Sequence, residues 1–170
     1  IIFILNFLNN IIEDQESNVK PPQFSRVSGF YPQNFKLKLV SEENTTIYYT
    51  LDSTDPRNSN TSKEFKDYIL INDRSLEPNL YSAINETEDS PVSICRGYRY
   101  NGPKYPVDKA MIVRAVTKNS KGDFSQVINK AYFADLYIYQ DLTTVSLITN
   151  PENLFDPDIG IYVTGTMYQN

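Results

Sequence analysis

The sequence predicts an all-β sandwich. Apolar Phe35, Leu37 and Leu39 alternate with Lys36 and Lys38, which places three apolar side chains on one face of a strand and two ammonium groups on the other. Further β-branched and aromatic runs cover residues 47–50, 68–71, 111–118 and 126–133. Clusters of Gly, Asn, Asp and Pro separate these runs, and no segment shows sustained helical periodicity. Short strands joined by turns are typical of a sandwich.

The composition limits the classes of function. The chain has 170 residues, of which 40% are hydrophobic, enough to bury one proper core. Its net charge of -5 and the absence of clustered Lys and Arg argue against nucleic-acid binding. It contains no histidine, which excludes Ser-His-Asp and Cys-His catalysis and His-ligated zinc. The single cysteine, Cys95, forms no internal disulfide and is interpreted as a small buried hydrophobe.

The first 22 residues are interpreted as a signal-peptide remnant or a linker. Residues 1–12 are apolar but interrupted by three asparagines, and they are too few to span a bilayer. They suit either the remains of a signal-peptide core or a packed helix. Polar residues 13–20, followed by Pro21 and Pro22, favour an extended linker. We therefore expect the folded module to occupy residues 23–135.

A long connection, residues 72–109, separates two of the predicted strands. Connections of this length usually carry function. Six of its side chains combine aromatic faces with hydrogen-bonding groups and suit contact with a sugar or a partner surface: Tyr81, Arg96, Tyr98, Arg99, Tyr100 and Tyr105. The alternative, favoured by the abundance of Tyr throughout the chain, is that these rings cover the sandwich.

Two pairs of aspartates raise the question of a metal or catalytic site. Asp52 and Asp55 do not fit the spacing of a calcium-binding loop, and Asp156 and Asp158 flank a proline. A glycosidase pair would need placement about a cleft, which spacing alone does not show. We favour turn-building, in which Asp accepts backbone N–H bonds. The sequence thus predicts no catalytic, metal-binding or cofactor-binding residue.

Four stretches resemble the chitobiase/β-hexosaminidase C-terminal-type module: residues 28–31, 47–56, 112–116 and 122–125. That family is an immunoglobulin-like or fibronectin-like sandwich, and the resemblance implies the same architecture here, with 72–109 as a long inserted loop. The family motif Tyr-Thr-x-Asp-Gly-x-Asp-Pro is matched at Asp52 and Asp55. Ser53 stands where glycine is common, and serine adopts a positive φ only at a cost.

Residues 73–79, 106–110 and 145–163 resemble the leader of spore-coat-protein-H-like (CotH) proteins, in which such a sandwich precedes an atypical kinase domain. The resemblance covers roughly residues 22–170 and implies that 136–170 is the truncated start of a CotH-kinase-like domain. Asn150, Pro151 and Glu152 have the order of an N-cap, a first-turn proline and an early acidic residue. They predict a one-turn helix through Phe155, then a turn at residues 156–157 and a strand at 161–164.

The resemblance implies a non-catalytic structural or binding module that positions an adjacent kinase-like domain of the same chain. It also implies a location that is secreted, at the cell surface or in a spore coat. No glycine-rich phosphate loop or kinase catalytic motif occurs in the sequence, so any kinase activity would belong to the parent protein. An alternative is an accessory module that binds a carbohydrate, with a cell-surface glycan or a coat protein as partner. We expect no cofactor, no nucleic acid and no membrane span.

Overall fold

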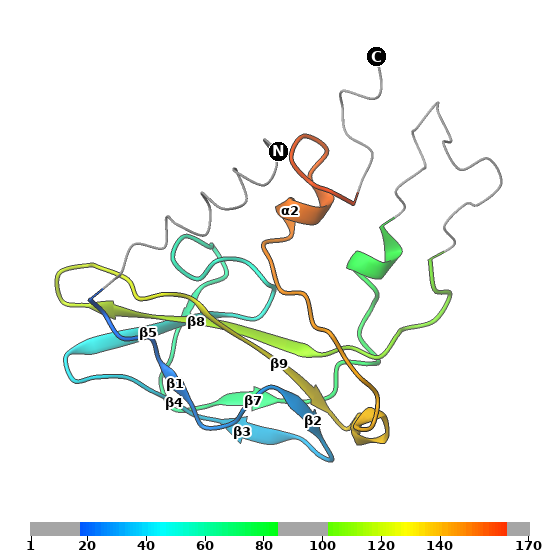
Figure 1. Cartoon of the computed structure of the whole chain (residues 1–170), viewed down its shortest axis with the longest axis horizontal. Coiled ribbons are helices and arrows are strands. Elements are labelled where there is room, and N and C mark those ends of the chain that lie inside the picture. Colours follow the sequence, from blue (N-terminus) through cyan, green and yellow to red (C-terminus); the bar gives the residue numbers. More distant parts are fainter. Residues whose placement is uncertain (1–17, 85–101, 163–170) are drawn as a thin grey trace. The chain divides into compact units, whose positions relative to one another are not determined.

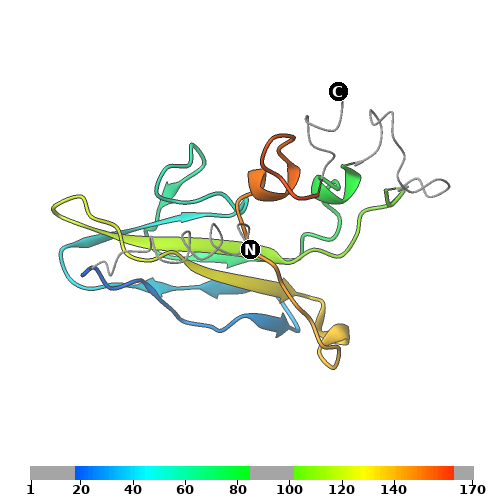
Figure 2. The same ribbon diagram turned by 45° about the horizontal axis from the view of Figure 1, so that its top comes forward.

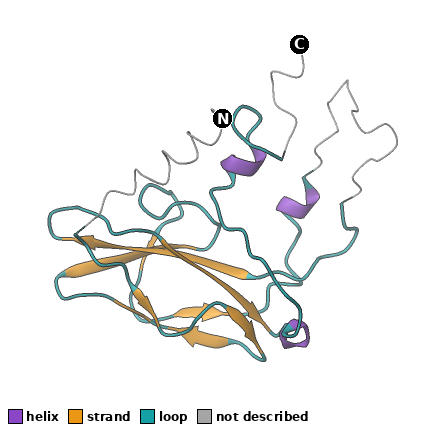
Figure 3. Cartoon of the chain, viewed as in Figure 1, coloured by secondary structure: helices purple, strands orange, loops and turns teal. Residues whose placement is uncertain are grey.

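The computed structural model describes residues 18–84 and 102–162. Strands make up most of the regular secondary structure of these residues and the helices are short pieces (Figure 3), which confirms the predicted all-β sandwich. The strands are β1 (Gln23–Phe24), β2 (Gly29–Tyr31), β3 (Phe35–Leu37), β4 (Leu39–Val40), β5 (Thr45–Thr50), β6 (Lys63–Glu64), β7 (Ile69–Ile71), β8 (Met111–Asn119) and β9 (Ile128–Ala134). The helical turns are η1 (Tyr81–Ala83), η2 (Tyr137–Tyr139) and α2 (Glu152–Phe155).

Several predictions fall outside the described residues. They concern the apolar residues 1–12, Cys95, the end of the strand expected at 161–164, and four of the proposed contact residues, Arg96, Tyr98, Arg99 and Tyr100. Among the described residues, no helix is long and apolar enough to cross a bilayer.

The strands form one large sheet and two small ones (Figure 1). The large sheet has the order β2-β9-β8-β5-β6, and the small sheets are β1-β4 and β3-β7. The described residues belong to two compact units that interleave along the sequence. Unit 1 comprises residues 1–28, 36–70 and 113–130, and unit 2 comprises 29–35, 71–112 and 131–170.

Unit 1 is built on the antiparallel pair β5 and β8. Six successive residue pairs join them, from Thr45 opposite Asn119 to Thr50 opposite Arg114. Antiparallel β1 and β4 form a second sheet, and Figure 2 shows the blue segment that carries β1 in a different layer from the yellow-green β8. Two layers with apolar side chains between them bury a core, as expected of a sandwich.

The sequence pattern predicts seven inward-facing residues, and the core contains five of them; the seven are Phe35, Leu37, Leu39, Ile47, Tyr49, Val113 and Ala115. Leu37, Leu39, Ile47, Val113 and Ala115 are buried. The other two predicted members, the aromatic residues Phe35 and Tyr49, are only half-buried. Large rings at the border of a core commonly keep one edge in solvent. The apolar alternation from 35 to 39 therefore identified the inward face correctly.

The single strand predicted at residues 35–39 is instead two strands in different sheets. The Lys38 N–H donates to Ser25 Oγ at 2.9 Å, and the Lys38 carbonyl accepts from the Ser25 N–H at 2.9 Å. Lys38 thus continues the β1-β4 ladder, whereas the preceding β3 pairs with β7. A strand that changes sheets forms a corner of the sandwich. The period-two pattern survives this change because the chain stays extended.

Unit 2 contains the parallel pair β2 and β9, with Gly29 opposite Tyr132 and Tyr31 opposite Ala134. The Tyr132 ring is fully buried and contacts Tyr31 and Phe35, with ring centroids 6.1 and 5.6 Å away. Burial raises the pKa of the Tyr132 hydroxyl well above its usual value, so this residue remains neutral. These ring contacts hold residues 29–35, the first segment of unit 2, against β9.

The predicted helix at 152–155 is confirmed as α2, but the strand predicted after Gly160 is not. Residues 161 and 162 form a bend, with the N–H groups of Ile161 and Tyr162 donating to the carbonyls of Asn153 and Leu154. These bonds return the chain to the helix and prevent an extended conformation. The predicted N-cap is also wrong, since no side chain caps α2 and the flanking residue is Pro151.

The same substitution should affect stability very differently at two neighbouring positions, buried Leu37 and exposed Lys36. Leu37→Asp should abolish folding, because an unpaired carboxylate at a fully buried position costs several kcal/mol out of about 5–15 kcal/mol of total stability. Lys36→Asp should lower the melting temperature only slightly, since the Lys36 side chain lies at the surface over the Tyr68 ring. Thermal unfolding by circular dichroism measures both. Equal losses would contradict the orientation of β3.

Candidate binding surface

The long 72–109 segment is closed at its base by one asparagine. The Asn79 amide donates from Nδ2 to the Tyr105 carbonyl at 2.9 Å, and its Oδ1 accepts from the Val107 N–H at 3.1 Å. Lys109 Nζ adds hydrogen bonds of 2.8 Å to the carbonyls of Glu77 and Val107. Two stretches far apart in sequence, at Glu77–Asn79 and Tyr105–Lys109, therefore lie side by side.

The first arm of this base is held by local hydrogen bonds. Asp73 Oδ1 accepts from the hydroxyl and N–H of Ser75, which hold the pKa of the Asp73 carboxyl below its usual range. The Asn34 side chain accepts from the Asp73 N–H, and Arg74 pairs with Glu77. The pKa of Glu77 is lowered by that hydrogen bond from Arg74. These contacts make the arm a defined structure.

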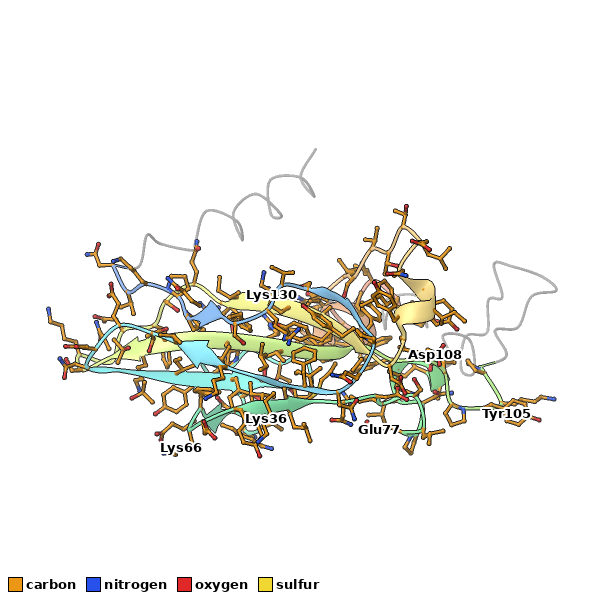
Figure 4. The ribbon with its side chains drawn as sticks, turned by 90° about the horizontal axis from the view of Figure 1, so that it is seen from below. Lys36, Lys66, Glu77, Tyr105, Asp108 and Lys130 are labelled. Atoms are coloured by element: carbon orange, nitrogen blue, oxygen red, sulfur yellow. The ribbon has the colours of Figure 1, made fainter. Side chains whose placement is uncertain are left out.

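Two of the six predicted contact residues lie in the described part of the segment, and they have different surroundings. The Tyr105 side chain is 80% exposed and points away from the ribbon (Figure 4). Tyr81 begins η1 and its ring stacks on Phe155, with centroids 5.0 Å apart and planes 2° from parallel. Tyr105 is thus presented to solvent, whereas Tyr81 is part of an aromatic cluster.

That cluster includes two residues that sequence reasoning missed. Phe155 ends α2, and Tyr162 packs edge-on against it at 5.5 Å and 71°. Their partner Tyr81 is distant in the sequence, so no local pattern connects the three rings. The one sequence signal near Phe155 was the helix start at Pro151 and Glu152. This signal predicted the helix but not the stacking of Phe155 on Tyr81.

Residues 150–162, here called the knob, form a closed structure around α2. Asp156 Oδ1 accepts from the N–H groups of Asp158 and Ile159, at 2.8 and 3.1 Å. The Gly160 N–H donates to the Asp156 carbonyl at 2.7 Å. A Cβ at position 160 would lie 2.5 Å from that same oxygen, so only glycine fits there. The knob is therefore a rigid feature, and it leaves Ile159 and Ile161 exposed.

The Asp52 turn in unit 1 is a self-contained polar network. Asp52 Oδ1 accepts from the N–H and hydroxyl of Thr54, and its Oδ2 accepts from the Thr61 hydroxyl at 2.6 Å. Ser53 has a φ of 67°, in the left-handed region where the resembling motif has glycine. The turn-building interpretation of Asp52 is confirmed, and the departure from the motif is accommodated by a strained serine.

Asp55 links this turn to strand β8. Its carboxylate accepts a bidentate pair from Arg57, with Nη2 2.6 Å from Oδ2. Arg114 of β8 is buried and donates to the Ser53 carbonyl at 2.6 Å and to Asn129 Oδ1 at 2.9 Å. Burial opposes ionisation of Asp55, but hydrogen bonds from Arg57 and the charges of Arg57 and Arg114 outweigh it. The pKa of Asp55 is therefore held below its usual range.

This arrangement determines what the aspartates do. The oxygens of Asp52, Asp55 and Asp156 accept N–H or O–H groups from their own turns. Among residues 18–84 and 102–162, no group of three or more potential ligands could hold a metal ion. The carboxylates therefore stabilise turns, whereas most of the exposed large hydrophobic side chains belong to unit 2.

The fold and its turn network define a fibronectin-like β-sandwich module. A family model described as Fn3 associated matches residues 36–132, more than half of the chain. The chain belongs to this Fn3-associated family. The match extends from β3 into β9 and includes the Asp52 turn and the closed base of the long segment. Neither the curated proteins nor the solved structures contain a significant match to the chain.

The Asp55 network predicts a pH-dependent contribution to stability. Asp55→Asn should lower the free energy of unfolding by about 1–3 kcal/mol at pH 7, because Arg57 loses its charged hydrogen-bond acceptor and buried Arg114 loses an opposing charge. A depressed folded-state pKa contributes stability that is present above the unfolded value of about 3.9 and is lost as pH falls through the folded pKa. The difference from the unmodified chain should therefore shrink below about pH 4.

Urea unfolding from pH 7 to pH 3 measures this difference. The matched control is Asp67→Asn, since the Asp67 carboxylate is exposed and lies 3.6 Å from Lys38 Nζ. A surface pair of this kind should change stability by less than about 1 kcal/mol. A pH-independent loss for Asp55→Asn would contradict the electrostatic origin of the effect.

Proposed function

We propose that this chain is a non-catalytic β-sandwich module of a spore-coat or cell-surface CotH-like protein, and that it positions an adjacent kinase-like domain of the same protein. The observation that carries the proposal is the concentration of exposed apolar side chains in unit 2. Most of the exposed large hydrophobic residues belong to that unit: Leu76, Leu80, Tyr81, Tyr105, Tyr137, Ile138, Tyr139, Leu142, Val145, Leu147, Ile159, Ile161 and Tyr162. Extensive exposed apolar surface usually marks an interaction site.

The knob is the part of this surface best suited to hold a neighbouring domain. Its backbone is fixed by Asp156 and Gly160, so contact with a partner costs little conformational entropy. Ile161 in the knob is 82% exposed, and residues 145–163 carry the resemblance to the CotH leader. The covering partner that we propose is the remainder of the kinase-like domain, whose start the CotH resemblance implies at residues 136–170, with Ile159 and Ile161 packed against an apolar site on it.

The non-catalytic character is supported by the internal use of polar groups. The carboxylates of the Asp52 and Asp55 turns and of Asp73 accept hydrogen bonds from nearby N–H and O–H donors, so they lack the open position that an acid-base catalyst needs. The exposed surface of unit 2 offers contact area instead. Carboxylates used in internal hydrogen bonds and an exposed apolar surface are both consistent with a non-catalytic scaffold module.

The proposal predicts that the knob couples the unfolding of two domains. In the parent protein, which carries the adjacent domain, Ile161→Asp should separate one calorimetric unfolding transition into two, because the apolar contact is lost. The isolated chain should keep its melting temperature, since Ile161 is exposed there.

The control is Val27→Asp, at a site in unit 1 that is 72% exposed. It should leave the single transition of the parent protein intact. An unchanged transition in the Ile161→Asp parent protein would show that the knob does not hold the domain.

Carbohydrate binding is a second candidate, favoured by the way Tyr105 is presented. Its carbonyl is fixed by Asn79, and its ring is largely in solvent. An exposed ring on a fixed backbone can stack on the apolar face of a sugar without first becoming ordered. The other proposed contact residues of the segment, Arg96, Tyr98, Arg99 and Tyr100, would extend such a site.

Carbohydrate binding predicts a selective signal on a glycan array that Tyr105→Ala lowers severalfold. Each stacking contact contributes about 1 kcal/mol, so the affinity should be weak. Tyr105→Ala should not lower the melting temperature, and Tyr137→Ala provides a control tyrosine outside the long segment. Loss of stability without any glycan signal would assign the Tyr105 ring a covering role.

A further inference from the structure

Two side-chain contacts join the segment that follows β9 to the closed base of the long segment, here Glu77–Asn79 and Tyr105–Lys109. The first is the stack of Tyr81, in η1, on Phe155, in α2. The second is a hydrogen bond of 2.7 Å that the Tyr139 hydroxyl, in η2, donates to Asp108 Oδ2. Figure 2 shows the green turn η1 beside the orange α2. All four residues belong to unit 2, so both contacts lie within one compact part of the fold.

Both contacts start beside the residues that close the base. Tyr81 lies two positions after Asn79 in the chain, and Asp108 directly follows Val107. The Asn79 side chain accepts from the Val107 N–H at 3.1 Å, which ties these two places to each other. Because so few peptide units separate the contact residues from this hydrogen bond, a displacement of the base displaces both of them.

The segment on the other side of the contacts is held unevenly. η2 directly follows β9, and the Asp135 N–H donates to the Tyr31 carbonyl at 2.9 Å, so η2 is attached to the sheet. α2 lies beyond residues 143–149, which form no backbone hydrogen bond within the described part of the chain. It has four residues, and so short a helix needs tertiary contacts to be stable in water. The placement of α2 therefore depends on its contact with Tyr81.

We propose that the two contacts form a clasp that opens as a unit, so that the base of the long segment orients the knob. When the clasp opens, Tyr81 leaves Phe155 and Tyr139 leaves Asp108 in the same event. Coupling of this kind is reciprocal, so whatever stabilises the base stabilises the placement of the knob by the same factor. The clasp involves unit 2 alone. Its consequence, that a partner bound to the long segment steadies the adjacent domain, rests on the proposed function.

Hydrogen exchange with mass spectrometry on the whole chain measures the opening of the clasp. Hydrogen-bonded amides at three places report on it: Ile84 after η1, Gln140 and Leu142 at the end of η2, and Gly160 and Ile161 in the knob. If the contacts open together, loss of either contact should speed exchange at all three places. If they open independently, each loss should speed exchange only beside the substituted residue.

Tyr81→Ala removes the stack of the clasp. It should speed exchange of the knob amides about threefold to tenfold, because the aromatic contact with Phe155 is lost. It should also speed exchange at the end of η2, which is distant from Tyr81 in the sequence. Tyr105→Ala is the control, since the Tyr105 ring is 80% exposed and its carbonyl, which the substitution keeps, joins the base. Unchanged knob exchange in the Tyr81→Ala chain would overturn the proposal.

Tyr139→Phe removes the hydrogen bond of the clasp and keeps the ring. It should speed exchange of the knob amides about twofold to fivefold, although the knob lies farther along the chain. Tyr137→Phe is the matched control, because it deletes a hydroxyl from the same turn and should leave the knob unchanged. Faster exchange beside η2 alone in the Tyr139→Phe chain would show two independent contacts and exclude the clasp.

The clasp and the domain contact of the knob can fail independently of each other. Ile161→Asp should leave exchange beside η1 and η2 unchanged, since the Ile161 side chain is exposed in the isolated chain. An unaltered calorimetric transition of the Ile161→Asp parent protein would reject the domain contact only. Exchange that responds at one place alone would reject the clasp only.

Discussion

The pairing of β8 with β5 is the constraint on which the rest of the structure depends. β8 lies between β9 and β5 in the large sheet and is buried at most of its positions. A central strand that is covered on both faces must be apolar almost throughout, and Val113, Ala115 and Val116 satisfy this. Arg114 and Thr117 are the buried polar residues of this strand, and the Arg114 guanidinium must be satisfied by fixed partners.

Arg114 connects the sheet to the turn that follows β5. Its bond to the Ser53 carbonyl and its attraction to Asp55 place the turn next to the middle of the sandwich, where Asp52 and Thr61 complete the network. The strained φ of Ser53 is tolerated because the surrounding hydrogen bonds determine the conformation. Asp52 and Asp55, the pair that most resembles a metal or catalytic site, therefore stabilise the turn.

The function that we propose consequently lies in unit 2, which holds most of the exposed large hydrophobic side chains. The knob presents isoleucines on a backbone fixed by Asp156 and Gly160, which suits a shaped site on a partner. In the described part of the chain, residues 143–149 form no backbone hydrogen bond, and Val145 and Leu147 among them are exposed. Extensive exposed apolar surface usually marks an interaction site.

The sequence by itself determined the period-two strands, their inward residues and the one-turn helix at 152–155. These depend on side-chain alternation and on proline chemistry, which act between near neighbours. The resemblance carried by the Asp52 motif left the conformation at Ser53 open, and the structure shows that this serine adopts a positive φ. The all-β class followed from the same local signals.

Only the tertiary structure decided which strands share a sheet. Lys38 forms hydrogen bonds with Ser25, so the chain passes from the β3-β7 sheet to the β1-β4 sheet. It also decided that Tyr81 stacks on Phe155 and that Asn79 closes the long segment onto Tyr105. These contacts join residues far apart in the chain and depend on packing that no local pattern encodes.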